Sequence, residues 1–164
     1  MTHIISIVGR SKTGKTTLLE KLLVELTNRG YRVATVKHTP MGSHETGNDK
    51  DSERHLKAGS AAVIIAEPSR LVLIKPVAAT PSVDEISRLY GEEYDLIITE
   101  GFKQDNAPKL EVHRKNVAPP LKDIRNVFAI ATDETLNTAV QQFNLDNIKG
   151  ITDFIESKFI KPVK

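Results

Sequence analysis

The sequence predicts a three-layer α/β fold with a mostly parallel sheet and one antiparallel hairpin. An apolar run at residues 4–8 is followed by the pattern G-x-x-x-x-G-K-[ST] at 9–16 and then by a helical stripe of leucines. Later apolar runs alternate with amphipathic segments, which is typical of parallel strands connected by helices. Two further runs are joined by only three residues, a link that permits antiparallel pairing alone. The 164 residues fit a single domain spanning 1–164.

The first strand and helix frame a glycine-rich loop. The isoleucines and valine of residues 4–8 suit a strand buried on both faces, and Gly9 ends it where the chain must turn. Between Thr16 and Arg29, leucines recur at spacings of three and four, so they lie on one face of a helix that stops at Gly30. The loop between them directs backbone N–H groups and the positive end of the helix dipole to one point. That point attracts a polyphosphate.

The loop residues predict a nucleoside triphosphate site and a P-loop NTPase fold. Gly14 lets the backbone approach the phosphates, Lys15 reaches the outer phosphates, and the Thr16 hydroxyl is placed to bind Mg²⁺. The predicted contacts of this phosphate loop are Gly9, Arg10, Ser11, Lys12, Thr13, Gly14, Lys15, Thr16 and Thr17.

A second strand and a long polar loop follow the first helix. Residues 31–37 form the next strand-like run, and residues 38–52 carry no apolar stripe. Loops this long inside a compact domain are usually functional or disordered. A short helix at about 51–58 is predicted after this loop.

The next two apolar runs predict the hairpin. Residues 61–66 and 70–76 are separated by the turn at 67–69, so we expect them to pair antiparallel at one side of the sheet.

A helix is predicted at 82–90. Ser82 is a suitable N-terminal cap, and Val83, Ile86 and Leu89 are expected to face inward.

The rest of the chain completes the sheet. A buried strand is predicted at 95–99, a half-exposed one at 109–114 because its residues alternate, and an apolar one at 127–131. A short strand at 140–145 and a helix at 147–159 close the chain.

Ligands of such sheets sit outside the carboxyl ends of the strands, which points to Lys37, His38, Glu100 and Asp133. Lys37 and His38 are predicted phosphate or substrate contacts. Glu100 closes an apolar strand and suits a carboxylate near Mg²⁺, while the N–H of the next residue, Gly101, would face the terminal phosphate. A strand-end glutamate that only caps a turn is the alternative.

Two aspartates have a functional and a structural interpretation each. Asp51 is a candidate second carboxylate for Mg²⁺ or a helix cap. Asp133 stands where many guanine-binding domains keep Asn-Lys-x-Asp, but only its aspartate is present here. It is a candidate for base recognition or an ordinary cap.

Composition narrows the class of protein. The formal net charge of +2 gives no argument for a nucleic acid or membrane partner, and the chain has no cysteine for disulfides or Cys-based metal sites. The chain has neither a leader-like segment nor a bilayer-length apolar run, so we expect a cytoplasmic protein.

Four segments together resemble the MobB family, the molybdopterin-guanine dinucleotide biosynthesis protein B family. They are Gly-Arg-Ser-Lys-Thr-Gly-Lys-Thr-Thr-Leu-Leu, Val-Lys-His-Thr, Lys-Asp-Ser-Glu-Arg-His-Leu-Lys-Ala-Gly-Ser, and Ile-Thr-Glu-Gly-Phe-Lys followed by Pro-Lys-Leu-Glu-Val. The similarity runs from about residue 3 to 155.

The resemblance implies a dimeric GTP-binding protein with weak GTPase activity. It also implies work beside a MobA-type nucleotidyltransferase, when GMP is attached to molybdopterin. Lys15, Thr16 and Glu100 are implied to bind nucleotide and metal, with Lys37, His38 and the Phe102-Lys103 region facing the cleft.

A small-molecule kinase using ATP is the rival function. Such an enzyme needs an arginine-bearing lid, whereas the arginines at 54, 70, 88, 114 and 125 are scattered.

With no obvious residue to position a water, GTP hydrolysis is expected to be slow.

Overall fold

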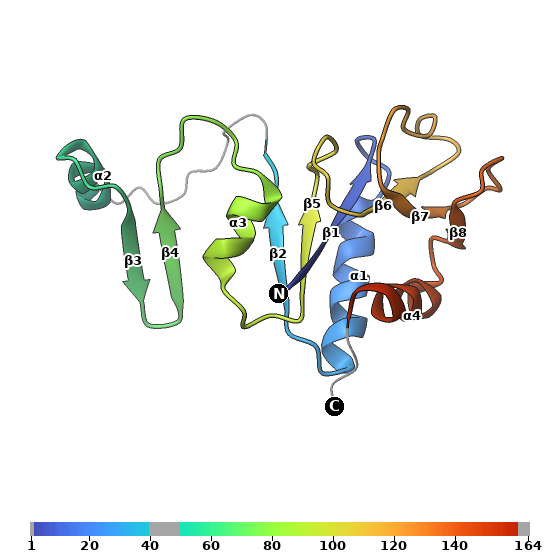
Figure 1. Cartoon of the computed structure of the whole chain (residues 1–164), viewed down its shortest axis with the longest axis horizontal. Coiled ribbons are helices and arrows are strands. Elements are labelled where there is room, and N and C mark those ends of the chain that lie inside the picture. Colours follow the sequence, from blue (N-terminus) through green and yellow to red (C-terminus); the bar gives the residue numbers. More distant parts are fainter. Residues whose placement is uncertain (1, 40–49, 161–164) are drawn as a thin grey trace. The chain divides into compact units, whose positions relative to one another are not determined.

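The structure is a computed structural model that describes residues 2–39 and 50–160 (Figure 1). The chain divides into two compact units. Unit 1 is built from Met1–Thr39 and Ser82–Lys164, and unit 2 from Pro40–Pro81. The prediction of a single domain stays a prediction. Within the described ranges no helix has the length and apolar character needed to cross a bilayer.

Unit 1 contains a six-stranded parallel sheet in the order β2-β5-β1-β6-β7-β8 (Figure 1). This sheet and the separate hairpin confirm the predicted fold class. The strands are β1 (His3–Gly9), β2 (Val33–Lys37), β5 (Leu96–Glu100), β6 (Lys109–His113), β7 (Val127–Thr132) and β8 (Gln141–Asn144).

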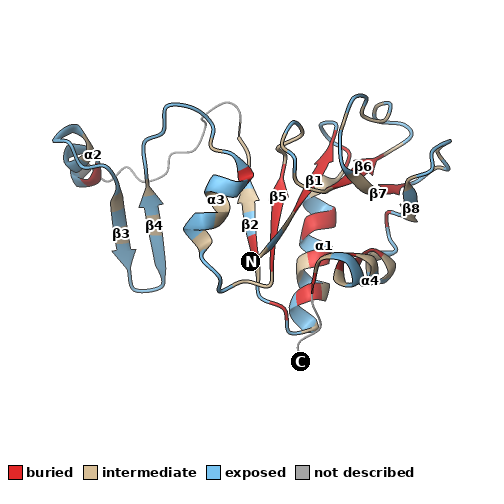
Figure 2. Ribbon diagram, in the orientation of Figure 1, coloured by how far each residue is buried: buried red, intermediate tan, exposed pale blue. Residues whose placement is uncertain are grey.

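One face of the sheet is covered by two helices, α1 (Lys15–Asn28) and α4 (Ile148–Phe159). Their inward side chains and alternate residues of the central strands form one apolar cluster, which appears red in Figure 2. Its fully buried members include Leu22 and Leu26 of α1 and Ile155 of α4. The leucine spacing that predicts α1 therefore supplies its contact with the sheet.

The half-exposed strand expected at 109–114 is wrong in its burial. All five residues of β6 are buried, because β6 has a hydrogen-bonded neighbour on each side and its polar side chains find partners. The Lys109 ammonium donates to the carbonyls of Asp105 and Ala107, the latter at 2.9 Å. In β6 the alternating pattern therefore separates apolar side chains buried in the core from polar side chains buried on the other face of the sheet.

Helix α3 (Val83–Tyr90) begins as predicted, with Ser82 accepting a bond from the Glu85 N–H in a capping box. Val83 is buried. Leu89, expected to face inward, is 58% exposed, so this expectation is wrong. The eight-residue helix presents too short a face to bury its last turn.

Unit 2 holds α2 (Lys50–Lys57) and the antiparallel pair β3 (Val63–Glu67) and β4 (Arg70–Ile74). The predicted hairpin is confirmed, but it forms a two-stranded sheet of its own and does not extend the main sheet. Residues 40–49 of the predicted long loop lie outside the described residues.

Candidate functional site

The phosphate loop, residues 9–16, connects β1 to α1 and depends on two glycines. A Cβ on Gly9 would lie 2.5 Å from the carbonyl oxygen of Val112 in β6, so only glycine fits there. Gly14 is the N-cap residue of α1 at φ +96°, a conformation that side chains disfavour. The first N–H groups of α1 therefore open onto the loop.

Lys15 begins α1 and folds back over the loop. Its ammonium donates to the Arg10 carbonyl at 2.8 Å, and the Thr13 hydroxyl donates to the same oxygen at 3.0 Å. Burial lowers the pKa of Lys15, Glu100 opposes that shift, and the positive charges of Lys103 and Lys37 add to it. Lys15 therefore lies within electrostatic range of one carboxylate and two further cations.

That carboxylate is Glu100, at the carboxyl end of β5, the strand between β1 and β2. Its side chain is only 7% exposed. The Thr16 hydroxyl lies 3.0 and 3.1 Å from its two oxygens, and the ammonium of Lys37 forms an ion pair with it. The structure therefore brings together Thr16, Lys37 and Glu100, which are 84 and 63 positions apart along the chain.

This hydroxyl and carboxylate suit magnesium, which prefers oxygen ligands. Within residues 2–39 and 50–160, no group of three or more His, Cys, Asp or Glu side chains could hold a metal alone. A bound Mg²⁺ would therefore share Thr16 and Glu100 with ligand phosphates and water, the usual arrangement for this ion.

The segment after β5 packs against the end of β2. The rings of His38 and Phe102 lie 4.6 Å apart, and a Cβ on Gly101 would meet the His38 Cβ at 2.9 Å. The Gly101 N–H donates to the Ile7 carbonyl at 3.0 Å. The expected contact of this N–H with a terminal phosphate is therefore not available in this conformation, because the parallel pairing of β5 with β1 continues through Gly101.

Sequence reasoning missed Arg114, which follows β6. Its Nε donates to the Thr13 carbonyl at 3.0 Å, and its guanidinium packs beside Gly14. No other hydrogen bond or ion pair links this guanidinium to a described residue. The sequence does show that Arg114 follows a strand. It does not show that this strand, β6, lies next to β1 and the phosphate loop.

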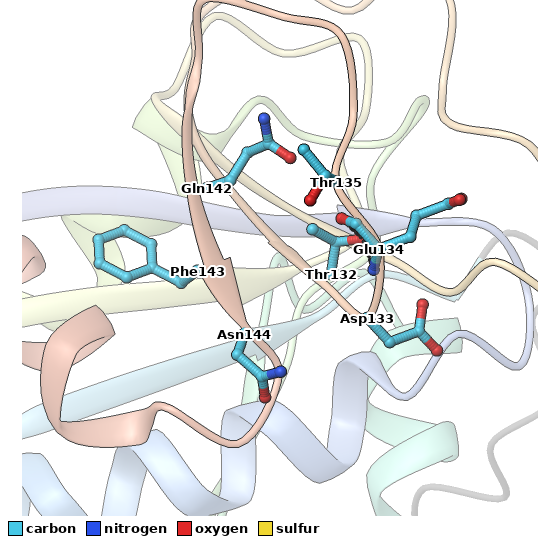
Figure 3. Close-up of a pocket in the computed structure, with 7 residues that line it drawn as sticks. All are labelled: Thr132, Asp133, Glu134, Thr135, Gln142, Phe143 and Asn144. Atoms are coloured by element: carbon cyan, nitrogen blue, oxygen red, sulfur yellow. Dashed lines mark hydrogen bonds between the residues drawn. The ribbon is translucent and has the colours of Figure 1, made fainter.

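Asp133 lines a pocket at the carboxyl ends of β7 and β8, drawn in Figure 3. The pocket has a volume of ≈ 320 Å³ and is formed by Thr132, Asp133, Glu134, Thr135, Gln142, Phe143 and Asn144. One Asp133 oxygen accepts the Lys115 N–H at 2.8 Å. The residue therefore holds the chain after Arg114, and its other oxygen has no partner among the described residues.

Asp51 lies on α2 in unit 2, where its carboxylate pairs with Arg54 at 3.1 Å. The phosphate loop belongs to unit 1. Its predicted metal role stays a prediction.

Comparisons with known proteins place this geometry in context. The family profile described as MobB, Molybdopterin guanine dinucleotide synthesis protein B, matches residues 4–133. The chain is 36% identical over 156 residues to a "Molybdopterin-guanine dinucleotide biosynthesis adapter protein" of Haemophilus influenzae, covering 94% of this chain and 88% of that protein. It is 33% identical over 164 residues to an Escherichia coli protein of the same description, covering 94% and 92%.

A solved structure agrees in fold. The crystal structure of a molybdopterin-guanine biosynthesis protein B superposes with a TM-score of 0.74 at 34% identity, covering 94% of this chain and 97% of the other.

Proposed function

The chain belongs to the MobB family, and from this premise we propose that it is a GTP-binding adapter in the biosynthesis of molybdopterin guanine dinucleotide, with slow Mg²⁺-dependent GTPase activity. Its relatives carry the description of an adapter protein in that biosynthesis. The nucleotide, the metal and the hydrolysis are argued below from the site itself.

The pairing of Thr16 with Glu100 beside the phosphate loop carries the proposal. A hydroxyl at the start of α1 and a carboxylate at the end of β5 meet at 3.0 Å, where the helix dipole favours negative charge. This constellation supports binding of a triphosphate with Mg²⁺. Lys15 would then leave the Arg10 carbonyl and neutralise the outer phosphates, as the phosphate-loop lysine does in enzymes that transfer phosphoryl groups.

Slow turnover follows from the groups at hand. Phosphoryl transfer to water needs a group that orients the water and a cation that stabilises the charge of the transition state. Lys37 is paired with Glu100, and Arg114 is bonded through Nε to the Thr13 carbonyl, so neither cation is held in place to orient a water. Such a site supports binding more than hydrolysis.

Guanine recognition is assigned to Asp133 and its pocket. The carboxylate would accept N–H groups of the base through the oxygen that is not bonded to Lys115. The pocket follows β7, two strands from β1 in the sheet, so phosphates over the loop and a base in the pocket would share one edge of the sheet.

We also assign a MobA-type nucleotidyltransferase as partner, with molybdopterin as its substrate, and a homodimer as the assembly. The hairpin of unit 2 supports the dimer, because Ile64, Leu71 and Leu73 are 63%, 72% and 46% exposed. Ile64 and Leu73 are directly paired, so these side chains share one face. A group of exposed apolar side chains of this kind is typical of a protein–protein interface.

Titration with fluorescent GTP and ATP analogues tests the proposal. We expect GTP with Mg²⁺ to bind more tightly than ATP, and Lys15→Ala to weaken binding by at least about tenfold, or about 1.4 kcal/mol. Lys149→Ala is the matched control, since Lys149 is 79% exposed and pairs only with Asp153 among the described residues.

Glu100→Gln checks the metal. It should remove the gain in GTP affinity that Mg²⁺ gives, while metal-free binding persists. A preference for ATP would favour the small-molecule kinase, and absence of binding to either nucleotide would contradict the proposal.

A further inference from the structure

The strand β6 places three polar side chains on the face that points away from the core formed with α1 and α4. Leu110 and Val112 enter that core, so Lys109, Glu111 and His113 point to the other face. Lys109 donates to two backbone carbonyls, and His113 bonds with Glu134 at 2.7 Å. Glu111 has no such complete set of partners.

A cavity of ≈ 360 Å³ lies against this face, with Glu111 in its wall. Its walls are mainly apolar and come from β7 and from the chain segments before β7 and β8. The apolar members include Pro120, Leu121, Ile124, Ile130, Leu136 and Val140, and the polar members besides Glu111 are Asp123, Asn137 and Thr138. Sites for small molecules are typically about 300–1,000 Å³ and are lined by apolar groups with a few polar ones.

Glu111 is 4% exposed. One oxygen accepts the Leu121 N–H at 2.7 Å, and the second has no partner among the described residues. Every fully buried side-chain nitrogen or oxygen in the described part of the chain has a partner, so the second oxygen must keep accessible surface. Glu111 lines the cavity, so we place that oxygen at the cavity wall.

A buried carboxylate with no cation bonded to it needs donors from elsewhere. Desolvation of an unpaired carboxylate is costly, and a ligand that offers N–H groups recovers that cost. The apolar walls at the same time favour a flat, largely apolar ring. A planar heterocycle with two adjacent N–H donors on one edge satisfies both conditions.

We propose that this cavity binds the 2-amino-4-oxopyrimidine edge of a pterin or guanine ring, with Glu111 accepting the ring N–H and the exocyclic amino group. The choice of ligand rests on the proposed function, because molybdopterin guanine dinucleotide contains both rings. Asn137 and Thr138 also line the cavity and supply further polar groups for the ring.

The cavity is distinct from the pocket of Asp133. The two share no lining residue. They are adjacent, however, because the Gln142 side chain of the Asp133 pocket bonds both the N–H and the carbonyl of Leu136, at 2.8 Å each. One nucleotide and one further ring can therefore be held on neighbouring parts of unit 1.

Fluorescence titration of the intact chain with free pterin tests the assignment. The chain has no tryptophan, so pterin emission is measured without interference. We expect saturable binding to the wild type, and Glu111→Gln to weaken it by at least about tenfold. Glutamine keeps an oxygen for the Leu121 N–H, so the loop contact survives while the charge is lost. Glu92→Gln, at an exposed position, is the matched control.

Lumazine, which has an oxygen in place of the 2-amino group, should bind at least about tenfold less tightly than pterin, because the carboxylate loses a donor. A second variant, Val140→Phe, adds volume to the cavity while leaving Glu111 unchanged and should also abolish binding. It serves if Glu111→Gln fails to fold, as judged by circular dichroism.

Titrations with guanosine and with GTP separate guanine from pterin as the bound ring, and separate this inference from the proposed function. If guanosine binds in a Glu111-dependent way and pterin does not, the ring is guanine. Equal binding of pterin to wild type and both variants, equal affinity for lumazine, or absence of binding to both rings would overturn the inference. The Glu111→Gln variant should bind GTP normally. If the wild type bound pterin but did not bind GTP, the proposed function would be overturned and the present inference would stand.

Discussion

A single arginine connects the phosphate loop to the strand beside it. Arg114 uses Nε on the Thr13 carbonyl and leaves the charge of its guanidinium next to Gly14. An arginine can present several N–H donors in a fixed plane, which a lysine cannot. This residue therefore has the chemistry to hold the loop and contact a phosphate at once.

Arg114→Ala should weaken GTP binding by about tenfold, because a charge-assisted contact and the support of the loop are both lost. Arg114→Lys should recover less than half of that free energy, since it lacks the planar donors. The titration with the fluorescent GTP analogue measures both. Unchanged affinity in Arg114→Ala would show that the guanidinium contacts no ligand.

The glycine at the end of β1 gives a second residue-scale prediction. In Gly9→Ala the new Cβ would lie 2.5 Å from the Val112 carbonyl oxygen, so β1 and β6 must separate. We expect a loss of about 1–3 kcal/mol in the free energy of unfolding, the range for overpacked sites. Urea denaturation measures it.

Gly30→Ala is the comparison for that measurement. A Cβ on Gly30 meets no atom within 4 Å, so the variant carries only the strain of φ +87°. If Gly9→Ala were no less stable than Gly30→Ala, the packing of β1 on β6 would be looser than described.

Individual residues of the site differ in how far the sequence could predict them. The meeting of Thr16 with Glu100 follows from two local rules, a loop pattern and the position at a strand end. Arg114 belongs to no pattern, and its place depends on β6 lying next to β1, which is a long-range fact. The bond between Gly101 and Ile7 depends on how far β5 pairs with β1, which the sequence does not mark.

At the scale of elements, the pairing of α1 with α4 is anchored by a charged cluster around Arg29. The guanidinium contacts Glu25 of α1, and Asp153 and Glu156 of α4, each at 2.7 Å. The Tyr31 hydroxyl also donates to Glu156. This bond, followed by the charge and donors of Arg29, lowers the pKa of Glu156.

This cluster predicts the direction of acid destabilisation. A carboxyl group with a lowered pKa in the folded state contributes stability above its unfolded-state pKa, and that contribution is lost as pH falls through the folded-state pKa. The Tm of the wild type should therefore fall between about pH 6 and about pH 3, where carboxyl groups titrate. Glu156→Gln should fall less steeply.

Glu20→Gln, on the exposed side of α1, is the control and should keep the wild-type slope. Thermal unfolding followed by circular dichroism gives each Tm. Parallel slopes for wild type and Glu156→Gln would mean that Glu156 titrates alike in the folded and unfolded protein.

The elements themselves were predicted where one local pattern decided them. The leucine spacing predicted α1, and Ser82 as an N-terminal cap predicted the start of α3, to which the structure adds the Glu85 half of the capping box. The burial of β6 was not predictable in the same way, because its alternating residues are compatible with either solvent or a polar interior. Only the bonds of Lys109, Glu111 and His113 decide between them.

At the scale of the whole molecule, the hairpin of unit 2 predicts the state of association. With Ile64 and Leu71 exposed, the wild type should have the mass of a dimer in light scattering. Leu71→Lys should shift it to a monomer, because a buried ammonium would have no partner in an apolar interface. Binding of GTP should persist.

Val24→Lys is the matched control, since Val24 is a 63% exposed apolar residue of α1 in unit 1. A monomeric wild type, or a dimer that survives Leu71→Lys, would exclude the hairpin as the interface.

The antiparallel hairpin was predictable from its three-residue turn, whereas its separation from the main sheet depends on contacts between distant residues.

The two points at which the chain leaves and re-enters unit 1 are held by one loop. At the exit, the His38 N–H donates to the Glu100 carbonyl at 3.0 Å and its ring meets Phe102. At the return, the Val83 N–H donates to the Asp105 carboxylate at 3.2 Å. The strand pairings of the parallel sheet all lie within unit 1. Changes within unit 2 should therefore leave the sheet and the phosphate loop intact, and with them the proposed nucleotide site.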